Sequence, residues 1–92
     1  MAIVILRYWA AAKEAAGTAE EKVTAQTLAE ALEAAISRQA SPPPAERASR
    51  LRDVLARSSF LINGNPAGTR PRAAITLADG DLVEVLPPFA GG

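Results

Sequence analysis

Apolar residues recur along this chain at spacings that predict several short strands and two main helices. The first strand covers residues 2–9, which are rich in β-branched and aromatic side chains. Its alternate positions form two apolar sets, with Val4, Leu6 and Tyr8 on one face and Ile3, Ile5 and Trp9 on the other. A strand with one face in water alternates apolar and polar residues more cleanly than this. We therefore expect the second face to be covered as well, either by the protein's own loops or by a partner.

The clearest helix begins near residue 27. Thr27 and Glu30 have the spacing of a capping box, in which each side chain satisfies a backbone N–H at the start of a helix. The stripe expected to face the core consists of Leu28, Leu32, Ala35 and Ile36. The proline run at residues 42–44 ends this helix, because proline cannot donate the backbone hydrogen bond that a helix needs.

Residues 46–57 predict a second, shorter helix, which turns Leu51, Val54 and Leu55 inward. Its outward positions carry Arg47, Arg50, Arg52 and Arg57. Because Glu46 and Asp53 lie among these arginines, we interpret them as a solvated face rather than a phosphate site.

The remaining elements are short. They are a helix at residues 10–16 ended by Gly17, a polar edge strand at 20–25, a strand at 59–62 closed by the Asn63-Gly64 turn, and a buried strand at 82–86. Strands separated by a helix with one apolar face predict an α+β fold, in which a mixed sheet packs on one main helix.

Composition narrows the class of protein. Ninety-two residues that are 49% hydrophobic suit one globular domain. Ten basic and ten acidic residues leave no net charge to attract nucleic acid. We find neither an apolar run long enough to span a bilayer nor a signal pattern, so we expect a cytoplasmic protein without a membrane partner.

The chain contains no cysteine and no histidine. This excludes a cysteine nucleophile, a Ser-His-Asp triad and the usual zinc sites. If the protein takes part in a reaction, we expect it to do so as a substrate or as a subunit.

The last residues suggest what that reaction is. Pro87 and Pro88 end the final strand and favour a stiff, extended path away from the domain. Phe89 follows as an apolar side chain on this arm, and Gly91 and Gly92 have no Cβ, so a narrow groove of another protein can close around them. A terminal carboxylate becomes a good electrophile only after a nucleotide activates it, and side chains at the last positions would obstruct the activating enzyme.

These residues resemble the ubiquitin-like sulfur carriers (MoaD/ThiS), and among them the small subunits of molybdopterin synthase. The resemblance covers nearly the whole chain. Its specific part is the Pro-Pro-x-Ala-Gly-Gly ending at residues 87–92, and residues 8–10, 61–64 and 77–81 are compatible with it. It implies a β-grasp domain at residues 1–86, followed by a flexible tail at residues 87–92.

The resemblance also implies a reaction cycle. An E1-like enzyme uses ATP to adenylate the Gly92 carboxylate, and a sulfur donor protein converts the adenylate to a thiocarboxylate. The tail then enters a pocket of the large synthase subunit, which carries the catalytic groups and passes the sulfur to a pterin precursor. The implied roles are the reactive group for Gly92, clearance for Gly91, and aiming and anchoring of the tail for Pro87, Pro88, Phe89 and Ala90. No bound cofactor is expected on this chain.

Two features depart from the family pattern, and other functions stay open. Phe89 stands where the family often has valine, and the stretch at residues 41–47 is longer than in compact members. Related carriers supply sulfur for thiamine or cysteine synthesis. A protein modifier joined to target lysines through Gly92, and a binding module with an inert tail, are alternatives of other classes.

Strand parity suggests where the partner binds. It places Ile5, Trp9, Phe60 and Ile62 on the sheet face opposite the long helix, as an apolar patch for the large subunit.

Overall fold

The sheet of this protein has five strands in the order β2-β1-β5-β3-β4. The computed structural model describes residues 2–40 and 46–88. The strands are β1 (Ala2–Tyr8), β2 (Glu20–Ala25), β3 (Ser59–Ile62), β4 (Asn65–Pro66) and β5 (Leu82–Leu86). β1 and β5 are parallel, and the other neighbours are antiparallel, so the predicted mixed sheet is confirmed.

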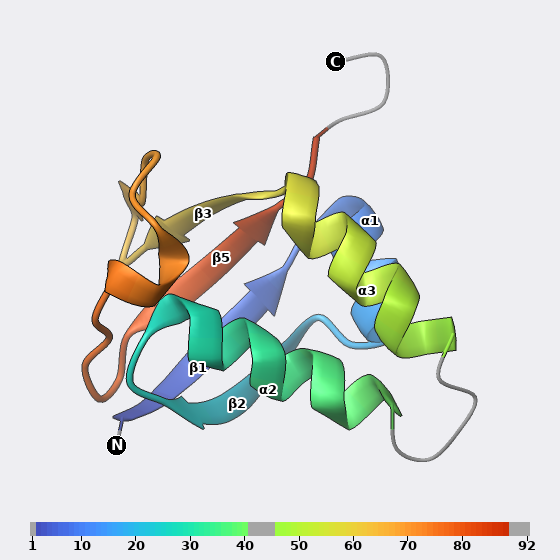
Figure 1. Cartoon of the computed structure of the whole chain (residues 1–92), viewed down its shortest axis with the longest axis horizontal. Helices are drawn as coiled ribbons and strands as arrows, with labels where there is room; N and C mark the ends of the chain where they lie inside the picture. The colour runs from blue at the N-terminus through green and yellow to red at the C-terminus, as the bar shows by residue number, and fades with distance from the viewer. Residues whose placement is uncertain (1, 41–45, 89–92) are drawn as a thin grey trace.

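Helices cover one face of this sheet (Figure 1). They are α1 (Ala10–Ala16), α2 (Leu28–Ala40), α3 (Glu46–Arg57) and the single 3₁₀ turn η1 (Arg72–Ala74). The stripe predicted for α2 is buried, and Leu51 and Leu55 of α3 are buried beside it. The core therefore lies between the sheet and the helices, of which α2 is the longest, and buried alanines of α1 also belong to it. No helix in the described parts of the chain is both long enough and apolar enough to span a bilayer.

The two faces of β1 differ in burial, and the loops that the structure describes do not cover the second face, which was one of the two expected alternatives. Val4, Leu6 and Tyr8 have at most 1% of their surface exposed, whereas Ile3 is 53% exposed. The strand ends one residue earlier than expected, at Tyr8, and Trp9 caps α1 instead. The inward set of β1 thus forms the centre of the core, and the outward set lies on the open face of the sheet.

The start of α2 is capped, and it is also held by a distant segment. The Thr27 hydroxyl accepts the Glu30 N–H at 3.2 Å, which confirms half of the predicted capping box. The Glu30 carboxylate accepts the Gln26 N–H, one residue before the predicted position. The Leu28 N–H donates to the Ile75 carbonyl at 2.9 Å, so the segment after η1 anchors this end of the helix.

The turn between β3 and β4 follows the predicted chemistry. Asn63 has φ 52° and Gly64 has φ 85°. Two positive φ values in a two-residue hairpin loop are typical of a type I′ turn, which Asn-Gly favours. The hairpin adds β4, a strand of two residues that pairs with the end of β3.

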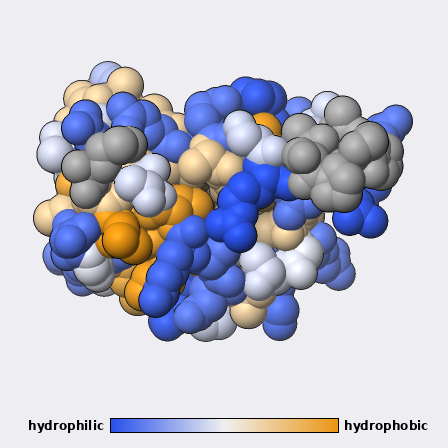
Figure 2. Space-filling view, turned by 90° about the horizontal axis from the view of Figure 1, so that it is seen from below, coloured by the Kyte–Doolittle hydropathy of each residue, from blue (hydrophilic) through white to orange (hydrophobic). Residues whose placement is uncertain are grey.

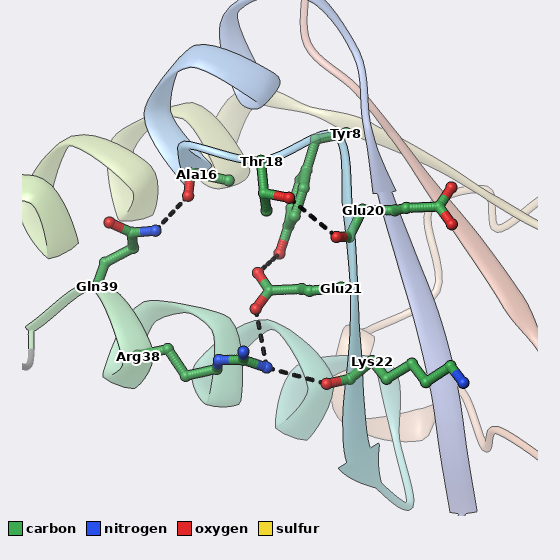
Figure 3. A network of polar contacts seen from close by, with 8 residues as sticks. All are labelled: Tyr8, Ala16, Thr18, Glu20, Glu21, Lys22, Arg38 and Gln39. Carbon is green, nitrogen blue, oxygen red and sulfur yellow. Dashed lines mark hydrogen bonds and ion pairs between the residues drawn. The ribbon is translucent and has the colours of Figure 1, made fainter.

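Tyr8 places a polar group at the margin of the core. Its hydroxyl donates to a carboxylate oxygen of Glu21 at 2.6 Å, and Glu21 also pairs with Arg38 at 3.1 Å (Figure 3). Burial, and then the bond to Glu21, raise the pKa of Tyr8 well above its ordinary value of 10.0. In the folded state Tyr8 therefore stays protonated at pH values where an unfolded chain ionises.

This shift predicts an alkaline loss of stability. Because the folded pKa is raised, the contribution of Tyr8 is fully present below the unfolded pKa of 10.0 and is lost as pH rises above it. We expect Tyr8→Phe to lower the free energy of unfolding at neutral pH by about 1 kcal/mol, the usual net value of a hydrogen bond. The variant should also lose stability less steeply above pH 10 in melting curves. An unchanged alkaline slope would show that groups other than Tyr8 cause the decline.

Candidate functional site

β5 leads the C-terminal segment out at one end of the sheet. Because β5 runs parallel to β1, both strands end on the same side of the molecule (Figure 1). The last residue of β5, Leu86, pairs with Ser59. Pro87 is buried and Pro88 is exposed. Phe89, Ala90, Gly91 and Gly92 lie outside the described residues, and their roles stay predictions.

Trp9 lies directly beside this exit. Its backbone N–H donates to the carbonyl of Val85 at 3.2 Å, and its indole N–H donates to the Glu84 carboxylate at the same distance. Its own carbonyl accepts the Ala12 N–H and begins α1. Held by these contacts, Trp9 still exposes 44% of its surface. An oriented, half-open aromatic ring is the kind of side chain that anchors protein interfaces.

Beyond Trp9, the open face of the sheet has a row of charged side chains followed by a row of apolar ones. Strand pairing first sets Arg7 between Glu20 and Glu84, and Arg7 Nε lies 3.0 Å from a Glu20 carboxylate oxygen. Further along β1, Ile5 lies beside Leu82, and Ile3 follows towards the start of the strand. The view from below shows hydrophobic residues gathered on one side of the molecule and bordered by hydrophilic ones (Figure 2). The face therefore offers a partner both apolar area and a charged row.

The assignment of Phe60 and Ile62 to this face is wrong. Phe60 pairs with Val85 and Ile62 pairs with Val83, and both valines are fully buried. Residues directly opposite each other on neighbouring strands share a face, so Phe60 and Ile62 point to the core. Phe60 is only 6% exposed, and Ile62 packs against the core while remaining partly buried. The assignments of Ile5 and Trp9 to the open face are confirmed, whereas partner binding by Trp9 stays a prediction.

The apolar residue of β3 on the open face is Leu61, which was not predicted from the sequence. It pairs with Glu84, which in turn pairs with Arg7. The sequence of β5 could have identified the open face. Charged Glu84 stands between two apolar valines, and this alternation places Glu84 on the solvent side of the strand. Following the pairs outward from Glu84 would have found Leu61.

The polar side chains of the open face pair mainly with one another. Residues 2–40 and 46–88 contain no group of three side chains placed to hold a metal ion. Among the side chains of the open face, Glu84 accepts a hydrogen bond from Trp9, and Glu20 forms an ion pair with Arg7.

Comparisons with known proteins agree with this geometry. The model of the ThiS family matches residues 6–92. No curated protein matches the chain significantly. Among solved structures, the chain is similar to small archaeal modifier protein 1 from Methanosarcina acetivorans, with 24% identity over 100% of this chain and 98% of that one and a TM-score of 0.78.

Two further structures link the fold to molybdopterin converting factors. The chain is 20% identical to a putative subunit 1 from Pyrococcus furiosus, covering 97% of this chain and 100% of that one with a TM-score of 0.70. It is 22% identical to a chain in the complex of subunits 1 and 2 from Helicobacter pylori 26695, covering 98% and 99% with a TM-score of 0.62. Together the similar structures confirm the predicted ubiquitin-like β-grasp fold.

Proposed function

The chain belongs to the ThiS family of ubiquitin-like sulfur carriers, and from that premise we propose that it is the sulfur-donating small subunit of a molybdopterin synthase. The observation that carries the proposal is the position of Trp9 on the open face, at the root of a segment that ends in Gly91-Gly92. A partner that binds this face lies beside the exit of the tail and can receive it. The complex of two converting-factor subunits from Helicobacter pylori shows that a chain of this fold assembles with a second subunit.

The chemistry at the tail needs three partners. An E1-like enzyme would join the Gly92 carboxylate to the adenylyl group of ATP and release pyrophosphate. A sulfur donor would then supply sulfur at the oxidation level of sulfide, which attacks the acyl carbon, displaces AMP and leaves a thiocarboxylate on Gly92. The large synthase subunit would bind the open face, receive the tail and supply the groups that move sulfur to the pterin precursor. This division of labour accounts for a carrier that lacks cysteine and histidine.

Mass spectrometry of the intact protein tests the carrier function. The chain is incubated with an activating enzyme, ATP and a sulfur donor, and we expect the mass gain of one oxygen replaced by sulfur at Gly92. Omitting ATP is the control, because the unactivated carboxylate is a poor electrophile. An unchanged mass with active partners would contradict the carrier function and leave a binding module with an inert tail.

The acceptor is tested separately, because carriers in thiamine and cysteine synthesis and protein modifiers share the same terminal chemistry. The thiocarboxylated chain is mixed with a large synthase subunit and a pterin precursor, and we expect release of the dithiolene product. Isopeptide-linked adducts in cells would instead show a protein modifier, the function that the name of the Methanosarcina protein states for that protein.

Trp9→Ala is expected to weaken binding of the large subunit by at least ten-fold. Aromatic side chains at interface centres commonly contribute 2 kcal/mol or more, about a thirty-fold change in Kd. Stability should fall less, because the side chain is 44% exposed and the backbone bond to Val85 remains. Calorimetric titration gives the Kd, and a melting curve gives the stability. A variant that melts far lower but binds normally would show that Trp9 serves the fold alone.

A further inference from the structure

The outer edge of β2 is where the sheet could accept another strand. In an antiparallel ladder, alternate residues direct their N–H and C=O groups to opposite sides. The Tyr8 N–H donates to the Ala19 carbonyl at 2.8 Å, so odd-numbered residues of this segment face β1. Glu20, Lys22 and Thr24 therefore point their backbone groups away from the sheet. Such an unpaired edge is a template for pairing with another chain.

Two backbone carbonyl groups of this edge already accept hydrogen bonds from side chains. The Thr18 hydroxyl donates to the Glu20 carbonyl at 3.0 Å, and Arg38 Nη1 donates to the Lys22 carbonyl at 3.0 Å. Arg38 comes from the last turn of α2 and crosses a polar hollow of about 600 Å³ between that helix and β2 (Figure 3). Its guanidinium therefore lies in the space that an incoming strand would fill. It also uses the Lys22 carbonyl, to which that strand would donate a hydrogen bond.

Arg38 is held in this position by a chain of contacts from the core. Its guanidinium lies 3.1 Å from Glu21, whose side chain is only 9% exposed. The other oxygen of Glu21 accepts the hydroxyl of buried Tyr8. The next residue of α2, Gln39, donates to the Ala16 carbonyl at the end of α1, which ties this end of the helix down. Most exposed arginines are free to move, whereas this one is oriented by a buried carboxylate.

We propose that Arg38 closes the edge of β2 against strand pairing with a second copy of this chain. The sequence of the edge suits such a copy, because an antiparallel pairing about Glu21 forms two Glu20–Lys22 pairs between the chains, which outnumber the single pair of Glu21 residues that the same register sets opposite each other. The opposite edge of the sheet needs less protection, because β4 has two residues and one is Pro66. With the edge of β2 closed, the chain stays monomeric and its open face remains available to a different partner.

The test is the oligomeric state of Arg38→Leu, measured by size-exclusion chromatography with light scattering over a range of concentrations. We expect the mass to rise from that of a monomer towards that of a dimer as concentration increases. Arg52→Leu is the matched control. Its side chain is 59% exposed against 58% for Arg38, and it also pairs with a glutamate at about the same distance, but it lies on α3 away from the edge. This control should stay monomeric.

Two more variants distinguish edge pairing from other causes. Arg38→Gln opens the carbonyl of Lys22 without adding apolar surface, and should also dimerise. Adding Lys22→Pro to either variant should restore the monomer, because the Lys22 N–H points outward and its loss removes no bond to β1. Arg38 variants that stay monomeric, a dimer that survives Lys22→Pro, or equal dimerisation of Arg52→Leu would each overturn the proposal.

Discussion

Removing Gly91 and Gly92 is expected to abolish sulfur transfer while leaving the melting temperature nearly unchanged. The reactive carboxylate would then belong to Ala90, two residues short of the activating enzyme's reach. Reaction rates fall steeply when the reacting atom is misplaced by even about 1 Å, and one extended residue spans about 3.3 Å. The core cluster of the described residues reaches no further along the chain than Val85, so we expect the deletion to leave the folded body intact. Intact-mass analysis for the thiocarboxylate and a melting curve check the two halves of the prediction.

Gly91→Ala provides a graded control in the same experiment. The added methyl group is harmless in water, but inside a close-fitting channel an extra carbon costs about 1–3 kcal/mol. We therefore expect adenylation or sulfur transfer to fall about ten-fold or more, because 1.4 kcal/mol corresponds to a factor of ten. Wild-type rates from this variant would show that glycine is not needed at this position for clearance.

Phe60→Ala is expected to lower the free energy of unfolding by about 3–5 kcal/mol, the usual range for removing a buried phenylalanine. Phe60 is 6% exposed and lies opposite fully buried Val85 in the centre of the sheet. The Arg72 guanidinium also lies over the Phe60 ring, 4.6 Å from the ring centre. Arg72 in turn donates to the Leu55 carbonyl at 2.9 Å near the end of α3. The variant would thus loosen β3, α3 and η1 together, and urea unfolding measures the loss.

Leu61→Ala is the matched control for Phe60→Ala, because Leu61 is the next residue of β3 and lies on the open face. Leu61→Ala should lower the free energy of unfolding by less than Phe60→Ala does, because the Leu61 side chain is already partly exposed. Its effect on binding of the large subunit should exceed its effect on folding. The reverse result, with Phe60→Ala stable but defective in binding, would return Phe60 to the partner surface.

Local patterns predicted the elements of this fold well. The alternation in β1 separated its two faces because every second side chain of a strand points the same way. Thr27 and Glu30 predicted the start of α2, and Asn63-Gly64 predicted a tight turn, because each of these depends on a few neighbouring residues. The absence of cysteine and histidine limited the chemistry without any knowledge of the fold.

The faces of β3 could not be assigned in the same way. Phe60, Leu61 and Ile62 are all apolar, so alternation within the strand does not say which of them is buried. Pairing with β5 decides it, because Val83 and Val85 place Phe60 and Ile62 in the core. The burial of Pro87 likewise depends on the body around the end of β5 rather than on the Pro-Pro pair itself.

The edge of β2 is the part of the molecule for which tertiary structure matters most. Tyr8, Glu21 and Arg38 lie on β1, β2 and α2, and no spacing in the sequence connects them. Residues 20–25 by themselves predicted a polar edge strand, which is what local composition can show. Which backbone groups of that strand face outward, and which side chain covers them, follows only when the ladder with β1 and the packing of α2 bring distant residues within 3 Å of each other.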